Sequence, residues 1–261
     1  MRSIIALVDF TENSTNAARY AADMAAFIDA ELHLVHVLDL PDIPITVPIP
    51  DYVIDEMRNS CFNSLENLSL ELKRQTGGKV QVGSDLETGN LFSNVKNFCL
   101  WKKPFIVVMG ASSKTDLWNL PFPLLIIPAK VRFHPIQKIV LACDKEEINT
   151  GIPIPLDFLK ELQDLFSARF DVLTVSVKDQ RAPAKLFDSW QESLIKNSLE
   201  VHFVSATSVE EGVHAYLDDH TADWLMLFPK RSGFFRPQKS IAKEIVLNCP
   251  LPAMAVPSGK K

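Results

Sequence analysis

The stretch IIALVDFTENS at residues 4–14 decides the fold, because it joins a buried strand to the start of a helix. Residues 4–8 form a short, continuously apolar run, which is typical of a strand buried on both faces of a parallel sheet. Residues 11–14 are helix-capping types, and alanines then recur at helical spacing as far as Ile28. With a second apolar strand at residues 32–38, this pattern predicts a β-α-β unit.

The same alternation continues toward residue 127. Residues 41–50 hold four prolines, which exclude a helix or a central strand and predict an extended surface loop. Beyond it, the apolar patterns predict helices and strands in turn: a helix over 53–72, a strand at 80–82, a helix over 91–99, and strands at 105–109 and 124–127. Strands that alternate with helices favour a parallel sheet with right-handed crossovers.

The second half of the chain repeats the first. The run IVLACD at residues 139–144 matches the first strand and again ends in Asp. The sequence PLPAMAVP at 250–257 matches PFPLLIIP at 121–128 nearly position for position. We therefore predict the α/β class, with two tandem Rossmann-like domains over 1–131 and 136–261, each a five-stranded parallel sheet flanked by helices.

Composition narrows the classes of function. A net charge of −5 gives no overall attraction to nucleic acid or to an acidic membrane, and no apolar run is long enough to span a bilayer. The four cysteines are scattered in apolar surroundings, which favours buried, reduced thiols over a disulfide set or a metal site. Without a signal-peptide pattern at residues 1–10, these features predict a cytoplasmic protein.

Sequence motifs of enzymes and metal sites are missing. There is no G-x-S-x-G, Walker A or G-x-G-x-x-G pattern, and no zinc-binding histidine spacing. His33 and His36 are three apart on one predicted strand, so they face opposite sides and cannot chelate together. We therefore expect no metal and no catalytic residue.

The opening strand and alanine-rich helix, the stretch from Ala30 to Val37, residues 105–113 and the closing P-x-P strand together resemble the universal stress protein family. The resemblance implies an adenine nucleotide alpha hydrolase-like fold in each domain. It also implies that the two domains pair internally through their last strands, with a homodimer of the chain as the other arrangement. It implies a stress-response role.

Nucleotide-binding members of that family carry a G-x-x-G loop after the fourth strand, then G-[ST] at a helix start, and an Asp at the end of the first strand. Glycines let backbone N–H groups approach phosphate, and the helix N-terminus adds its dipole. The positions of this chain that match or replace those residues are the nucleotide-binding candidates: Asp9, Gly110, Ser112, Ser113, Asp144, Lys230, Arg231, Lys239 and Ser240. Either Asp could instead cap the turn that follows its strand.

Both halves depart from the family pattern. Ser113 stands in place of the second glycine, and only about ten residues separate Gly110 from Pro121, so a helix is missing there. In the second half Phe228 and Pro229 replace the start of the loop, and Pro229 has no N–H to donate. We therefore predict a non-catalytic regulatory protein that binds an unknown protein partner, with no cofactor and no standard ATP-binding loop.

Other interpretations remain open. The basic loop at 230–239 is either an anion site at the mouth of the sheet or a solvated loop. The first interpretation favours a switch that binds ATP or AMP through an atypical phosphate site in the second domain. A weaker alternative is a small-molecule carrier that uses a cleft beneath the loop at 41–50.

Overall fold

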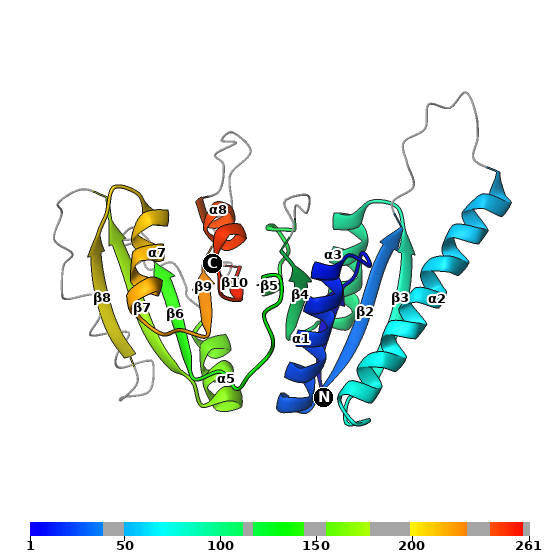
Figure 1. Ribbon diagram of the computed structural model, residues 1–261, viewed down its shortest axis with the longest axis horizontal. Coiled ribbons are helices and arrows are strands. Elements are labelled where there is room, and N and C mark those ends of the chain that lie inside the picture. The colour runs from blue at the N-terminus through cyan, green and yellow to red at the C-terminus, as the bar shows by residue number, and fades with distance from the viewer. Residues whose placement is uncertain (39–49, 112–116, 144–154, 178–198, 229–240, 258–261) are drawn as a thin grey trace. The chain divides into compact units, whose positions relative to one another are not determined.

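The computed structural model describes residues 1–38, 50–111, 117–143, 155–177, 199–228 and 241–257. The chain divides into two compact units, Met1–Phe133 (unit 1) and His134–Lys261 (unit 2), shown in Figure 1. That residues 1–131 and 136–261 each fold as a domain stays a prediction from the sequence. No helix of the described residues is long and apolar enough to cross a membrane.

Unit 1 is a parallel sheet with the strand order β3-β2-β1-β4-β5. Its elements are β1 (Arg2–Leu7), α1 (Glu12–Ile28), β2 (Ala30–Leu38), α2 (Asp51–Gln75), β3 (Val82–Thr88), α3 (Leu91–Lys102), β4 (Ile106–Gly110) and β5 (Leu124–Ile127). Helices α1 and α2 lie on one face of this sheet and α3 lies on the other (Figure 1).

Unit 2 repeats this order as β8-β7-β6-β9-β10, again with parallel pairs. Its elements are β6 (Lys138–Cys143), α5 (Leu156–Phe166), β7 (Arg169–Ser176), β8 (Leu199–Ser205), α7 (Val209–Asp219), β9 (Trp224–Leu227), α8 (Ile241–Asn248) and β10 (Ala253–Ala255). Two five-stranded parallel sheets flanked by helices confirm the predicted fold class.

The strand registers set the two units in correspondence residue by residue. When the strands of each unit are counted in chain order, the first strand pairs with the second and the fourth, and the second strand pairs with the third. The equivalent Cα pairs are Ile4–Leu32 with Ile139–Phe170, Ile4–Ile106 with Ile139–Trp224, and Leu32–Val82 with Phe170–Leu199. This correspondence allows the side chains of the two units to be compared at equivalent positions.

Small side chains let α1 pack closely on the sheet of unit 1. Thr11 caps the helix by accepting a hydrogen bond from the Ser14 N–H through its side chain, as the polar cluster at 11–14 predicts. The alanines of its inner face are completely buried: Ala17, Ala18, Ala21, Ala22 and Ala25. Phe133, the last residue of unit 1, packs edge-on against Tyr20, with ring centroids 5.4 Å apart.

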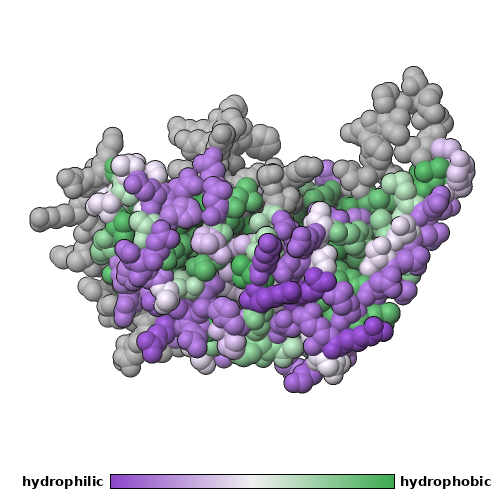
Figure 2. Space-filling view, in the orientation of Figure 1, coloured by the Kyte–Doolittle hydropathy of each residue, from purple (hydrophilic) through white to green (hydrophobic). Residues whose placement is uncertain are grey.

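The edge of the sheet in unit 1 differs from the sequence-based prediction. The third strand was predicted at 80–82, whereas β3 begins at Val82 and follows β2 as far as Thr88. Most of its residues are only half-buried, so the apolar pattern that marks a central strand is absent. Helix α2 packs on β3 through Leu65, Leu68 and Leu72. The side of α2 that is visible in Figure 2 is largely hydrophilic.

Candidate functional site

Asp9 lies just beyond β1 and caps the turn into α1. Its Oδ1 accepts hydrogen bonds from the Thr11 N–H at 3.1 Å and from the Thr11 hydroxyl at 2.6 Å. Burial raises the pKa of Asp9, but the hydrogen bonds from Ser14 and Thr11 outweigh burial and hold that pKa below its ordinary value. Of the two interpretations of this carboxylate, capping is therefore the role that its hydrogen bonds show.

Gly110 ends β4 directly beneath the N-terminus of α1. A Cβ atom at this position would lie 2.6 Å from the carbonyl carbon and oxygen of Asn13 and 2.9 Å from the Ser14 nitrogen. The Asn13 side chain also donates a hydrogen bond to the Ala111 carbonyl at 3.2 Å, which ties the two segments together. Close helix–strand packing thus explains the glycine without any phosphate group.

The connection that follows β4 distinguishes the two units. In unit 1, residues 117–123 form no helix before β5, and Leu117 and Leu120 of this segment are buried. In unit 2, the eight-residue helix α8 stands between β9 and β10. The shorter connection of unit 1 thus carries no helix in its described part, in keeping with the missing helix expected from the spacing.

The other nucleotide-binding candidates lie outside the described residues. They are Ser112, Ser113, Asp144, Lys230, Arg231, Lys239 and Ser240. The prediction that they bind a nucleotide therefore stays a prediction, as does the interpretation of the loops at 41–50 and 230–239.

A second group of polar residues lies on the edge strand and its neighbour in both units. By strand register, His33 of β2 corresponds to Asp171 of β7, and Asp85 of β3 corresponds to His202 of β8. The His33 and Asp85 side chains approach to 3.6 Å, and those of Asp171 and His202 to 3.7 Å. The two units therefore hold the same histidine–aspartate pair with its members exchanged between strands.

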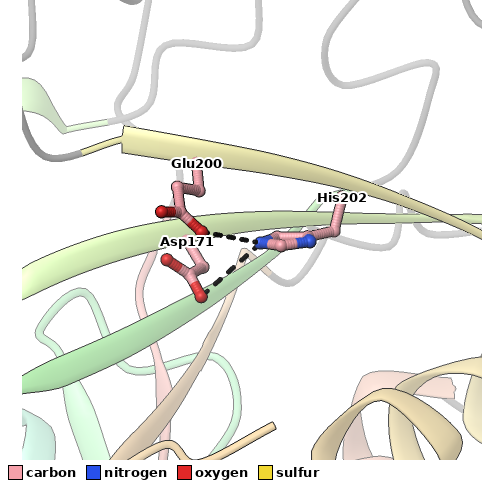
Figure 3. A group of neighbouring side chains, drawn as sticks. All are labelled: Asp171, Glu200 and His202. Carbon is pink, nitrogen blue, oxygen red and sulfur yellow. Dashed lines mark ion pairs between the residues drawn. The ribbon is translucent and has the colours of Figure 1, made fainter. Parts of the chain in front are cut away.

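The pair in unit 2 belongs to a larger cluster (Figure 3). Asp171 is buried in β7, and its Oδ2 accepts a hydrogen bond from the Tyr216 hydroxyl at 2.9 Å and contacts the Lys138 Nζ at 2.8 Å. Glu200 approaches the same His202 nitrogen, Nε2, that faces Asp171, at 3.6 Å. Asp171, Glu200 and His202 are residue types that hold metal ions, and one ligand atom of each lies within 4.8 Å of the others.

Aromatic rings from α7 and from its C-cap residue, His220, lie beside this cluster. Tyr216 stacks on His220 with centroids 4.1 Å apart, and the His202 ring lies 5.0 Å from Tyr216. Burial raises the pKa of the Tyr216 phenol, and the hydrogen bond to Asp171 and the charges of Asp171 and Glu200 raise it further. The phenol therefore stays protonated and donates a hydrogen bond to the Asp171 carboxylate.

The corresponding cluster of unit 1 is arranged differently. Asp85 faces Nδ1 of His33, while Glu31 faces Nε2 at 3.6 Å and the Lys102 Nζ lies 3.3 Å from that nitrogen. The two carboxylates thus lie at opposite nitrogens of one ring. His36 is on the other face of β2, with its Nδ1 2.7 Å from the Val8 carbonyl oxygen, as the strand spacing predicts.

No sequence motif indicated the cluster of unit 2. Its members come from β6, β7, β8 and α7, and the spacing between strands depends on a long connection. The available signal was the polar pattern of Asp171 inside an otherwise apolar strand, because a charge within such a run is rarely buried without a partner. That signal identifies one buried carboxylate and does not identify its partners.

The family model described as the universal stress protein family matches residues 1–121. The first unit belongs to the universal stress protein family. No curated protein matches the sequence.

Solved structures extend the resemblance in fold over both units. A universal stress protein from Archaeoglobus fulgidus DSM 4304 matches with a TM-score of 0.76 and 16% identity, and the match covers 98% of this chain and 98% of that one. A functionally unknown protein from Pseudomonas aeruginosa PAO1 matches with a TM-score of 0.59 and 13% identity, over 99% of this chain and 93% of that one. At these identities the two matches show a shared fold.

Proposed function

We propose that this chain is a regulatory stress-response protein of the universal stress protein type, which acts by binding a protein partner and catalyses no reaction. The proposal rests on what the structure shows in the segment that follows β4 in unit 1. Family members that bind nucleotides use a glycine loop and a helix N-terminus at this place. Here residues 117–123 carry no helix, and the approach of Asn13 accounts for Gly110.

The physical argument concerns what holds a phosphate group. Backbone N–H groups and the dipole of a helix N-terminus supply most of the attraction in such loops. Without the helix, a phosphate beside β4 in unit 1 would lack that part of the attraction. Asp9 already accepts two hydrogen bonds from Thr11, so a ligand that used the same oxygen would have to compete with this cap.

A second candidate function is a nucleotide-dependent switch in unit 2, with ATP or AMP as the ligand. One observation favours it: α8 is present in this unit and begins just after the basic loop at 230–239. A helix N-terminus there would attract an anion, and Lys230, Arg231 and Lys239 would add charge in place of glycine N–H groups. Asp144 would then stand where the family has its nucleoside-contacting Asp.

Thermal unfolding with and without millimolar ATP, ADP and AMP, each with Mg²⁺, tests the two candidates. A ligand at about 100 times its Kd stabilises by about 2.7 kcal/mol, which raises the midpoint by several degrees. The partner-binding proposal expects no shift. A rise with ATP that Lys239→Ala removes would instead establish the switch, and Lys73→Ala on α2 is the control for loss of a surface charge.

Assembly and compartment are also part of the proposal. The resemblance implies that the two units pair through β5 and β10, so that one chain is equivalent to a family dimer, with a chain homodimer as the alternative. The four free cysteines fit a reducing compartment, and we assign the protein to the cytoplasm. Size-exclusion chromatography with light scattering would distinguish a monomeric chain from a homodimer.

A further inference from the structure

Two carboxylates in unit 2 converge on one imidazole nitrogen, and we infer that Asp171, Glu200 and His202 form a site for a divalent transition metal such as zinc. His202 Nε2 lies 3.7 Å from Asp171 Oδ2 and 3.6 Å from Glu200 Oε2 (Figure 3). Both separations are too long for hydrogen bonds. Among the described residues, the buried Nε2 atom has no hydrogen-bond partner at all.

A metal ion between the three atoms would account for this spacing. Ligand atoms on a tetrahedral ion with bonds of about 2.0–2.2 Å lie about 3.3–3.6 Å apart. The observed 3.6 and 3.7 Å are close to that range, and the ligand atoms of the three residues all lie within 4.8 Å of one another, so a contraction of the cluster would place all three atoms in contact with one ion. An N–H group at Nε2 could not donate equally good hydrogen bonds to both carboxylates, because the N–H bond points along a single direction.

The burial of the three residues suits a site that exchanges its ion with solvent. The Asp171 side chain is 4% exposed, that of His202 is 26% exposed, and that of Glu200 is 75% exposed. The ion would enter from the side of Glu200, and water would complete its coordination there. On the inner side, the Tyr216 hydroxyl donates a hydrogen bond to Asp171 and so fixes the direction of that ligand.

Lys138 occupies the cluster when no metal is bound. Its ammonium lies 2.8 Å from Asp171 Oδ2, the oxygen that the metal would take, and so neutralises a buried carboxylate. The Lys138 side chain is 28% exposed and can move its charge into water. Metal binding therefore exchanges one cation for another, and the ammonium competes with the metal.

The equivalent pair of unit 1 gives an internal comparison. Glu31 and Asp85 approach different nitrogens of His33, so no single point lies near all three groups. Hence the inference applies to unit 2 alone. One imidazole with two carboxylates favours Zn²⁺, Co²⁺ or Mn²⁺ over Mg²⁺, which prefers oxygen ligands, and the affinity should rise from Mn²⁺ through Co²⁺ to Zn²⁺.

Zinc binding to the full chain, freed of metal and without an affinity tag, tests the site. Equilibrium dialysis with metal analysis should find one zinc ion per wild-type chain and none above background for His202→Gln. Glu200→Gln, at an exposed position where folding is least affected, should weaken binding at least about tenfold. His33→Gln removes a histidine from unit 1 and is the matched control, so it should bind zinc as the wild type does.

Lys138→Met separates a metal site from a simple ion-pair network. If the ammonium competes for Asp171, its removal should tighten zinc binding by about tenfold. Zinc should also restore the thermal midpoint that the variant loses. Equal zinc binding by the wild type, His202→Gln and Glu200→Gln would overturn the inference, and so would weaker binding by Lys138→Met. Neither readout depends on nucleotide or on a partner, so the result is independent of the proposed function.

Discussion

Gly110 lies so close to Asn13 that a Cβ atom on residue 110 would come within 2.6 Å of the Asn13 carbonyl oxygen. Gly110→Ala should therefore destabilise unit 1 by about 1–3 kcal/mol, because α1 or β4 must shift to relieve the contact. Urea denaturation measures the loss. Ala129→Ser adds an atom at an exposed position and is the control. A Gly110→Ala variant as stable as the wild type would show that the two segments separate without cost.

Thr11 anchors the N-terminus of α1. Thr11→Ala should lower the free energy of unfolding by about 1 kcal/mol, since it removes both the cap to the Ser14 N–H and a donor to Asp9. Thr11→Ser keeps the hydroxyl and should retain most of the stability. If serine and alanine cost the same at this position, the methyl group rather than the cap stabilises the helix.

Asp9 should make stability depend on pH at the acid end. The pKa of its carboxyl is lowered in the folded state, so its contribution is complete above the ordinary value of 3.8 and is lost as the pH falls through the lower folded pKa. Asp9→Asn should flatten the decline of the thermal midpoint below about pH 4. Asp55→Asn, on the exposed side of α2, should leave that decline unchanged.

Tyr216 should contribute to the stability of unit 2 through its hydrogen bond to Asp171. Tyr216→Phe leaves the ring in place but removes a donor to a buried carboxylate, which should cost about 1.5–3 kcal/mol. Chemical denaturation measures this loss. Tyr52→Phe removes a hydroxyl from a side chain that is 71% exposed and should cost nothing measurable. Equal stability of the two variants would mean that Lys138 alone satisfies Asp171.

Thiol reagents should distinguish the cysteines. Burial raises the pKa of Cys99 to about 12 and that of Cys249 to about 11, so at pH 8 neither provides much of the reactive thiolate. Cys61 is only partly buried and should react first with a disulfide reagent. Mass spectrometry of the labelled chain locates the adduct, and Cys61→Ser should abolish the fast phase. A fast phase at Cys99 would require local opening of α3.

The amino-acid sequence predicts the order of strands and helices in both units well, and particular residues show the physical reason. Residues 4–8 have the apolar pattern of a buried strand because both faces of β1 are covered. The cluster of capping residue types at 11–14 predicted the start of α1, and Thr11 is the residue of that cluster that caps the helix. The edge strand β3 was placed too early because Ser84 and Asp85 are polar and half-buried. A half-buried edge strand of this kind lacks the continuous apolar run that is typical of the central strands.

The clusters of ionisable residues could not be predicted in the same way. Lys138, Asp171 and His202 are far apart in the chain, and the register of three strands brings them together. Pairing register depends on packing over the whole sheet, which a local pattern does not contain. The role of Gly110 was also hidden, because the contact with Asn13 joins residues nearly a hundred positions apart.

The exchange of histidine and aspartate between the two sheets limits how the repeats could be recombined. Grafting β7 in place of β2 would set Asp171 beside Asp85, two carboxylates with no imidazole between them, whereas the reverse graft would set two histidines together. Either chimera would lose the histidine–aspartate pairing that each parent has. Transplanting β7 and β8 as a block preserves it, so the smallest interchangeable module of this protein is a pair of neighbouring strands.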